Sequence, residues 1–177
     1  MKKFELTSKF VTDIFGTKLF RIKALISFGD VEEGELGGFV EKEENLDHCG
    51  NAWVYGNAQV CGNARVCGNA RVYGNAQVCG DAQVCGDAQV CGNAQVCGNA
   101  RVCGNKDYFC ANGFGRFGRN TTFFKTKDGS VAVSCGCFSG TVEEFREKVK
   151  ETHKDTKLAK EYLMLANLME YHFSEEE

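Results

Sequence analysis

Residues 50–103 read GNAWVY GNAQVC GNARVC GNARVY GNAQVC GDAQVC GDAQVC GNAQVC GNARVC, nine consecutive copies of one six-residue unit. In each copy Ala and Val are two positions apart. They therefore share one face of a short strand, and the residue between them points to the other face. The Gly-Asn or Gly-Asp pair supplies a corner, because these residues accept a positive φ. One copy cannot bury a core alone, so the copies must stack as coils, Val on Val and Ala on Ala.

Two interruptions of the pattern set the length of one coil. Tyr55 and Tyr73 replace the cysteine of the unit and are 18 residues apart, and Trp53 and Arg71 have the same spacing. Three hexads therefore form one coil, and nine hexads predict about three coils.

The hexads and the segment before them resemble known families. Their Val and Ala spacing is similar to the hexapeptide repeat of left-handed parallel β-helix proteins, whose architecture trimeric acyltransferases share. The stretch 20–60, FRIKALISFGDVEEGELGGFVEKEENLDHCGNAWVYGNAQV, resembles the head of β-helix proteins common in phages and prophages of gut bacteria. The first resemblance implies a triangular coil, and the second implies a mobile-element setting without a known reaction.

A triangular coil of 18 residues places the variable residues on three faces. The first face carries Trp53, Tyr55, Arg71, Tyr73, Gln89 and Cys91; the second carries Gln59, Gln77, Gln95, Cys61, Cys79 and Cys97; the third carries Arg65, Gln83, Arg101, Cys67, Cys85 and Cys103. Neighbouring strands lie about 4.8 Å apart. We therefore expect Tyr55 over Tyr73, and a cation–π pair between Trp53 and Arg71.

The regular cysteines are interpreted as packing residues. Free cysteine behaves as a small apolar side chain and fills the groove between coils. A disulfide is sterically possible, because the coil spacing falls within the Cα range of a bridge. A metal ladder is the third interpretation, but a straight column does not converge as a tetrahedral zinc site does.

The chain divides into three parts in this interpretation, which together form a mainly β fold. Residues 1–45 form a β-rich cap with a hairpin turn at Ile14-Phe15-Gly16, and 46–110 form the β-helix. Residues 111–177 hold a hairpin on the Asp128-Gly129 turn, a helix from Thr141 to about 152, a second helix over 156–173 and a solvated tail, SEEE. At the edges of the repeat, Leu46 is in phase with the Ala column and Tyr108 with the Val column.

Composition limits the classes of function. The net charge of −3 gives no general attraction to nucleic acid or to an anionic membrane. The start of the chain, MKKFELTSKF, lacks the apolar run of a signal peptide, and no run is long enough for a membrane helix. We therefore expect a cytoplasmic protein whose thiols are reduced, and a homo-oligomer, either dimer or trimer.

Three local motifs were weighed as sites. GFGRFG at 113–118 spells G-x-G-x-x-G, but the strand-like RNTTFFK after it argues against a dinucleotide fold and leaves a turn with two solvated arginines as one interpretation. In the other, Arg116 and Arg119 hold a phosphate and Phe114 and Phe117 stack on a base. Cys135-x-Cys137 with His153 lacks an evident fourth ligand, so neither a metal nor another cofactor is predicted.

Three functions follow as hypotheses. The favoured one is a non-enzymatic binding or inhibitor protein that acts on a host defence protein or on a nucleotide signal, a target class that only the phage resemblance implies. Its candidate binding residues are Trp53, Tyr55, Arg71, Tyr73, Arg65, Arg101, Phe114, Arg116, Phe117 and Arg119. The alternatives are a coenzyme A-dependent acyltransferase with His48 as base, and a self-assembling structural β-helix. Direct nucleic-acid binding is disfavoured, because the faces carry few positive charges.

Overall fold

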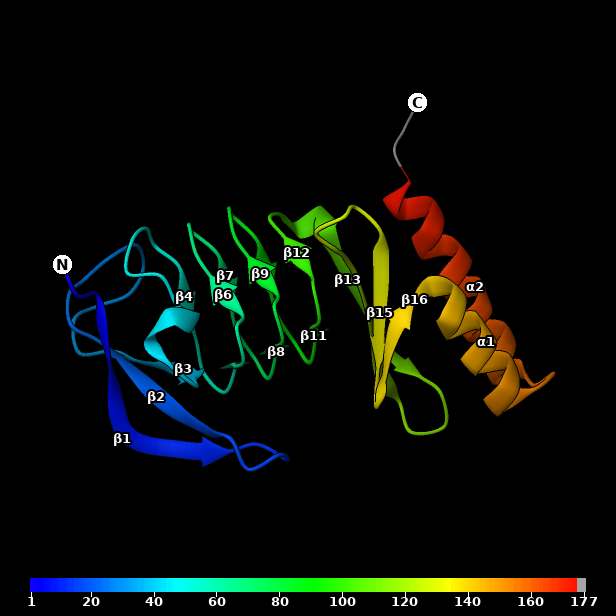
Figure 1. Cartoon of the computed structure of the whole chain (residues 1–177), viewed down its shortest axis with the longest axis horizontal. Coiled ribbons are helices and arrows are strands. Elements are labelled where there is room, and N and C mark those ends of the chain that lie inside the picture. The colour runs from blue at the N-terminus through cyan, green and yellow to red at the C-terminus, as the bar shows by residue number, and fades with distance from the viewer. Residues whose placement is uncertain (175–177) are drawn as a thin grey trace.

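The protein is an elongated parallel β-solenoid with a β-rich segment at one end and a sheet with two helices at the other (Figure 1). The structure is a computed structural model and describes residues 1–174. The three glutamates of the predicted acidic tail, 175–177, lie outside the described residues. The predicted mainly β fold with a repeat solenoid, a hairpin and two helices is confirmed.

Nine two-residue strands form the regular part of the solenoid, one from each hexad. They are β4 (Trp53–Val54), β5 (Gln59–Val60), β6 (Arg65–Val66), β7 (Arg71–Val72), β8 (Gln77–Val78), β9 (Gln83–Val84), β10 (Gln89–Val90), β11 (Gln95–Val96) and β12 (Arg101–Val102). Every third strand pairs in parallel. The first face is β4-β7-β10, the second is β5-β8-β11 and the third is β6-β9-β12.

The pairing register confirms the 18-residue coil. Trp53 is the partner of Arg71 in the ladder, and Val54 is the partner of Val72. The amide N–H of Tyr55 donates to the carbonyl of Val72, which places Tyr55 and Tyr73 on consecutive rungs of the first face. All three faces keep this register, as the spacing of the aromatic residues predicted.

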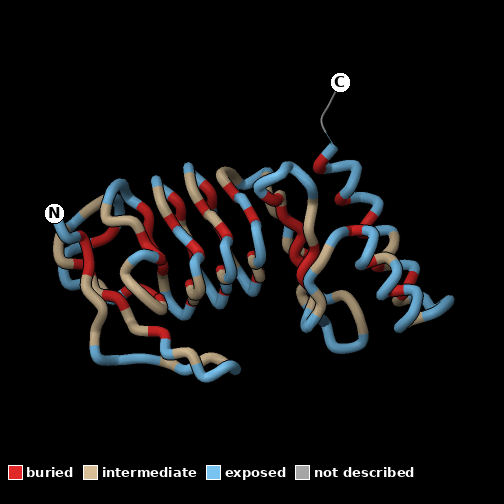
Figure 2. The backbone as a smooth tube through the Cα atoms, in the orientation of Figure 1, coloured by how far each residue is buried: buried red, intermediate tan, exposed pale blue. Residues whose placement is uncertain are grey.

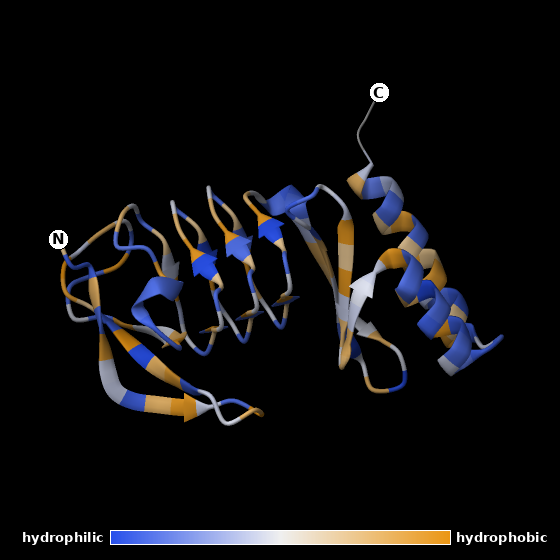
Figure 3. Ribbon diagram, in the orientation of Figure 1, coloured by the Kyte–Doolittle hydropathy of each residue, from blue (hydrophilic) through white to orange (hydrophobic). Residues whose placement is uncertain are grey.

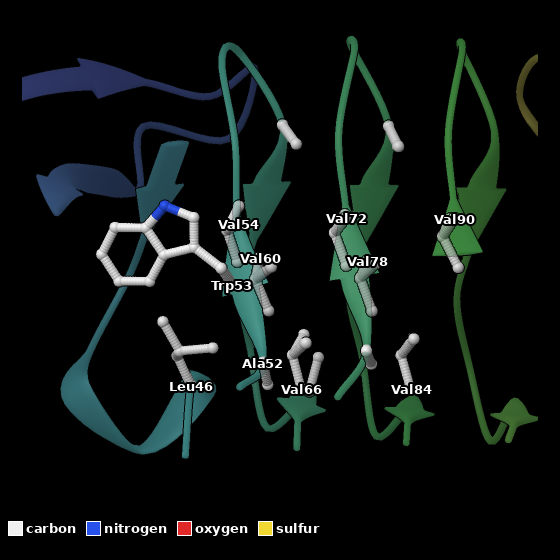
Figure 4. Packing of buried hydrophobic residues seen from close by; sticks show 14 of the residues in the cluster. Leu46, Ala52, Trp53, Val54, Val60, Val66, Val72, Val78, Val84 and Val90 are labelled. Carbon is white, nitrogen blue, oxygen red and sulfur yellow. The ribbon is translucent and has the colours of Figure 1, made fainter. Parts of the chain in front are cut away.

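Stacked side chains fill the inside of each coil. Every Ala and Val of the hexads is fully buried, and Figure 2 shows these positions in red along the inward side of the tube. The valines line up along the axis, as Val54, Val72 and Val90 do in Figure 4. The corners form a second ladder, in which the Asn51 amide donates to Asn69 and the Asn69 amide donates to Asp87. Apolar burial inside and amide ladders at the corners thus both favour the same register.

A further turn precedes the hexads, so the solenoid has about four turns instead of the predicted three. Strand β3 (Leu36–Val40) pairs with β5 on the second face, and Leu46 forms a bridge to Val66 on the third face. Between them lies a short 3-10 helix, Glu43–Asn45, whose buried Asn45 amide donates to the carbonyls of Gly62 and Ala64. The predicted phase of Leu46 is wrong. It lies in the Val column, because 20 residues instead of 18 separate it from Val66.

The N-terminal segment covers the open end of the first coil. Strands β1 (Phe4–Thr12) and β2 (Lys18–Ala24) form an antiparallel hairpin that extends the second-face sheet through β3. The predicted turn is present, and Gly16 has φ +87° there. At the coil end, Phe4 and Val31 are buried with the solenoid core, and the ammonium of Lys3 donates to the carbonyl of Ala52 at 2.9 Å.

The C-terminal sheet closes the far end. Its strands β13 (Tyr108–Phe114), β14 (Arg119–Lys125), β15 (Val131–Cys135) and β16 (Phe138–Thr141) are antiparallel neighbours in chain order. Adjacent residues of β14 serve two cores, because Phe124 packs on the solenoid and Phe123 packs beneath the helices. The apolar residues of β15 lie between these layers, in orange in Figure 3. A second 3-10 helix, Asn105–Asp107, leads into this sheet, so Tyr108 begins an antiparallel strand.

Two helices cover the outer face of that sheet. Helix α1 (Val142–His153) begins at the predicted capping box, in which the Thr141 hydroxyl accepts from the Glu144 N–H. Helix α2 (Lys157–Phe173) begins at the N-cap Thr156. Arg146 of α1 bonds Glu170 of α2, with Nη2 and Oε2 2.6 Å apart. The helices therefore pack on the sheet and on each other, on the side away from the solenoid (Figure 1).

The cysteines occupy the outer corner of each hexad and follow the same vertical register. Among the described residues, nine are free and partly or fully exposed. Cys85 and Cys103 are joined by a disulfide, with their Cα atoms 4.5 Å apart. The expectation of reduced packing thiols therefore does not hold for this pair, because stacking brings the two sulfurs together.

Candidate ligand-binding cleft

The aromatic first face is not the exposed surface that the sequence predicted. Trp53 is fully buried, since Phe4 and Phe28 of the N-terminal segment pack edge-on against its indole at 6.2 and 5.4 Å. In Figure 4 the indole extends beyond the first coil, away from the valine columns. Arg71 forms a salt bridge with Asp30, and no cation–π contact joins it to Trp53 within residues 1–174. The predicted cation–π pair is therefore wrong, and Trp53 is a core residue.

The other predicted residues of the coil faces are scattered. Tyr55 is half-buried and Tyr73 is exposed, with its hydroxyl 3.4 Å from the Gln89 amide oxygen. Arg65 and Arg101 are exposed on the third face and are two coils apart. These residues share no cavity.

A cleft opens instead at the far end of the C-terminal part. It lies between the β13–β14 loop, the β15–β16 turn, the end of α1 and the start of α2, at the lower right of Figure 1. Its volume is about 730 Å³, which is within the range of small-molecule sites. The loop is the GFGRFG motif, so the structure brings Arg116, Phe117 and Arg119 to one wall.

The cleft has a strongly cationic lining. Arg116 and Arg119 come from the loop side, and Lys148 and Lys154 come from α1 and its C-cap. No Asp or Glu lines the cleft among the residues that the structure describes. Lys148 pairs with Glu151, at 2.7 Å between Nζ and Oε2, but the other three cations form no salt bridge within residues 1–174. Their charges favour an anionic ligand.

Glycines make room for the two side chains that form the inner wall. A Cβ on Gly115 would lie 2.3 Å from the hydroxyl of Tyr162, and a Cβ on Gly136 would lie 2.8 Å from Nη1 of Arg119. Both contacts are shorter than real Cβ atoms make. Glycine at these positions thus lets the loop and the turn close on Tyr162 and Arg119.

Aromatic rings supply flat surfaces beside the charges. Phe117 is 74% exposed, and the guanidinium carbons of Arg116 and Arg119 each lie 5.8 Å from its ring centre. The Tyr162 ring stacks on His153, with centroids 5.8 Å apart. Burial, together with the neighbouring Cys135 thiol, raises the pKa of Tyr162 to about 12, so its phenol stays protonated and can donate a hydrogen bond.

Phe114 differs from its prediction. It is half-buried beneath the loop, where its ring packs against that of Tyr162 at 6.3 Å. It therefore supports the wall of the cleft, and Phe117 is the loop phenylalanine that is free to stack.

The end of α1 at the cleft is held in an unusual backbone conformation. Lys154 has φ +50°, and no other non-glycine residue among 1–174 has a positive φ. Such conformations cost about 1–3 kcal/mol and cluster at functional sites. Here the conformation places the Lys154 backbone between α1 and the N-cap of α2 at the rim of the cleft.

The weighed metal motif also reaches this cleft. Cys135, Cys137 and His153 all line it, but no three potential ligands in the described part of the chain are arranged to hold a metal ion. Lys148, Lys154 and Tyr162 were not predicted as site residues. The lysines at the end of α1 were visible only as ordinary helix-terminal charges, and Tyr162 only as part of an apolar stripe.

Comparison with known proteins identifies the repeat. Residues 58–74, 64–80 and 94–105 match the family described as the YdcK beta solenoid repeat. The matched residues lie within the solenoid and cover less than half of the chain, so the likeness concerns the scaffold. No curated protein matches the chain. No helix of residues 1–174 is long and apolar enough to cross a membrane.

Proposed function

We propose that this chain is a non-enzymatic binding protein whose C-terminal cleft takes a small anionic ligand with an aromatic ring, of the nucleotide class. The carrying observation is the lining of the cleft: four cationic side chains, no carboxylate and an exposed aromatic ring. Arginine suits phosphate, because its planar guanidinium donates two parallel hydrogen bonds to the anion. The solenoid in this proposal is a scaffold that carries the cleft.

The two loop arginines and Phe117 suggest how such a ligand would bind. Arg116 and Arg119 flank the Phe117 ring, so a phosphate on the arginines would place an attached base near that ring. Base–aromatic stacking contributes about 1–3 kcal/mol per base. On the opposite wall, the Tyr162 phenol and the free N–H groups at the start of α2 are further donors to an anion.

The biological role is proposed from the resemblance to phage and prophage proteins. In that setting, binding would remove a nucleotide signal of the host, and the protein would act as an inhibitor by sequestration. A host protein as the target is the variant of this proposal in which exposed Tyr73 and the coil faces make the contacts. Nothing in the cleft selects one nucleotide over another.

The acyltransferase alternative receives less support. His48, its candidate base, stacks on Phe4 at 4.4 Å between ring centres, and its Nδ1 accepts from the Lys3 N–H. The hexads from Gly50 to Cys103 run without an inserted loop. The imidazole is thus engaged in packing the N-terminal segment.

Calorimetric titration of the reduced protein with ATP, adenosine and inorganic triphosphate tests the proposal. ATP should bind more tightly than either fragment, because only ATP carries both the ring and the phosphates. The double variant Arg116→Ala/Arg119→Ala should weaken ATP binding at least tenfold, since each charge-assisted hydrogen bond contributes about 1.5–3 kcal/mol. Phe117→Ala should weaken ATP binding but leave triphosphate binding unchanged.

The chain provides a matched control. Arg65→Ala/Arg101→Ala removes the same charge from the third face, away from the cleft, and should leave ATP affinity within twofold. Equal losses in both double variants would show general charge attraction instead of a site. Failure of all three probes to bind at millimolar concentration would refute the proposal. Native mass spectra of the same samples report the predicted homo-oligomer.

A further inference from the structure

Three free thiols form a continuous column on the second face of the solenoid. Cys61, Cys79 and Cys97 each follow a strand of this face, and they lie on consecutive rungs. The amide N–H of Cys61 donates to Val78, and that of Cys79 donates to Val96, both at 3.0 Å. The thiol of Cys79 hydrogen-bonds the sulfurs above and below it.

The third face shows what this register permits. Cys85 and Cys103 stand in the same hexad position, one coil apart, and they are joined by a disulfide with Cα atoms 4.5 Å apart. A disulfide spans Cα separations of about 4.4–6.8 Å. Because the second face keeps the same 18-residue register, Cys79 and Cys97 are placed for the same bond.

Cys97 differs from the other thiols of its column in the groups around it. Its sulfur lies 3.4 Å from the Ser139 hydroxyl of β16 and also interacts with Ser134 of β15, so the C-terminal sheet adds donors that the regular coils lack. Hydrogen bonds from Cys79 and these two hydroxyls outweigh burial and lower the pKa of Cys97 to about 6. A thiol with these donors is a thiolate at neutral pH, which is the nucleophilic form.

The opposite end of the column has less favourable surroundings. Cys61 also accepts a hydrogen bond from Cys79, but the carboxylates of Glu41 and Asp13 face it and disfavour its thiolate. Cys79 lies between two sulfurs and keeps its proton, since its pKa is raised by the hydrogen bonds that it donates to both. The column therefore holds one activated thiolate, at Cys97, next to one protonated thiol, at Cys79.

We propose that Cys97 and Cys79 form a peroxide-reactive dithiol site, in which Cys97 attacks a hydroperoxide and Cys79 resolves the product as a disulfide along the solenoid axis. The Cys97 thiolate attacks the terminal oxygen of the hydroperoxide. The O–O bond breaks, the sulfur is oxidised to a sulfenic acid, and the peroxide is reduced to an alcohol, or to water when hydrogen peroxide is the oxidant. The Cys79 sulfur then attacks the Cys97 sulfur, the S–O bond breaks, and the hydroxyl leaves as water with the proton from Cys79.

The test begins with fully reduced protein that carries Cys85→Ser and Cys103→Ser, so that the third-face disulfide cannot contribute. One equivalent of hydrogen peroxide should remove two hydrogen masses from the intact protein. Digestion before Asp81 and Asp87 separates Cys79 from Cys97, so the bridge appears as a cross-linked peptide pair. A bridge that mainly joins any other pair of cysteines would overturn the proposal.

Further variants in this background assign the two roles. Cys79→Ser should leave a sulfenic acid on Cys97 that dimedone traps, and Cys97→Ser should slow peroxide consumption at least tenfold. Cys61→Ser is the matched control and should change neither rate nor product. Ser139→Ala should slow the first step several-fold while the far-ultraviolet circular dichroism stays unchanged. Oxidation of Cys97→Ser at the parent rate, or equal effects of Cys61→Ser and Cys97→Ser, would refute the assignment.

Discussion

Two equivalent corner glycines differ in what lies above them, and this difference yields a sharp prediction. Gly80 has φ +68° at the corner between β8 and β9, and Gly98 has φ +62° at the equivalent corner one coil later. A Cβ on Gly80 would lie 2.9 Å from the backbone nitrogen of Gly98. A Cβ on Gly98 would meet nothing within 4 Å.

The two alanine variants therefore separate backbone strain from stacking. Gly98→Ala incurs the left-handed penalty of about 1–2 kcal/mol, less about 0.4–1 kcal/mol from the reduced entropy of the unfolded chain. It should destabilise by about 1 kcal/mol. Gly80→Ala incurs the same terms and also pushes two coils apart, which adds the 1–3 kcal/mol typical of overpacking. The total for Gly80→Ala is about 2–4 kcal/mol.

Thermal unfolding followed by circular dichroism measures both variants against the parent. Because a chain of this size shifts its Tm by about 2–4 °C per kcal/mol, Gly98→Ala should lower Tm by a few degrees and Gly80→Ala by roughly 5–12 °C. Urea unfolding checks whether the order is the same at constant temperature. Equal losses in the two variants, or a larger loss for Gly98→Ala, would refute the claim that close coil stacking requires glycine at this corner.

Three further predictions concern single side chains. Burial lowers the pKa of Lys3 to about 8 from 10.5; the unfolded chain therefore holds an extra proton between these values, and urea titrations should show stability rising by up to about 3 kcal/mol across that window in the parent but not in Lys3→Met. Because the pKa of Cys97 is lowered to about 6, its alkylation by iodoacetamide should reach half its maximal rate near pH 6 and fall below it, whereas a rate still rising at pH 9 would contradict the thiolate. Thr141→Ala removes the N-cap acceptor of α1 and should cost about 1 kcal/mol in urea unfolding, with Thr141→Ser as the near-neutral control.

The sequence predicted the solenoid well because its information is local and repeated. Tyr55 and Tyr73, spaced like Trp53 and Arg71, gave the coil length, and the structure pairs those rungs. The helix starts were readable for the same reason, since a capping box such as that of Thr141 lies within four residues. Where the unit changed length, around Leu46, the phase was lost and the extra turn was missed.

Contacts between distant segments were not predictable in this way. Trp53 occupies a position that points outward in every other hexad, and only the packing of Phe4 and Phe28 over the first coil buries it. The cleft likewise combines a glycine-rich loop with the end of a helix about 35 residues later. Its arginines were candidates from the sequence, but no periodicity placed Lys154 or Tyr162 opposite them.

The 18-residue register also makes the protein a ruler with discrete marks. Both ends of the solenoid are closed by segments that contact only the coil beside them. Inserting or deleting three hexads would therefore keep every ladder in phase and change the separation of the two end segments by about 4.8 Å, one strand spacing. A change of one or two hexads would instead rotate one end segment to another face. The length of this molecule can thus evolve in whole coils, while the chemistry at its ends stays the same.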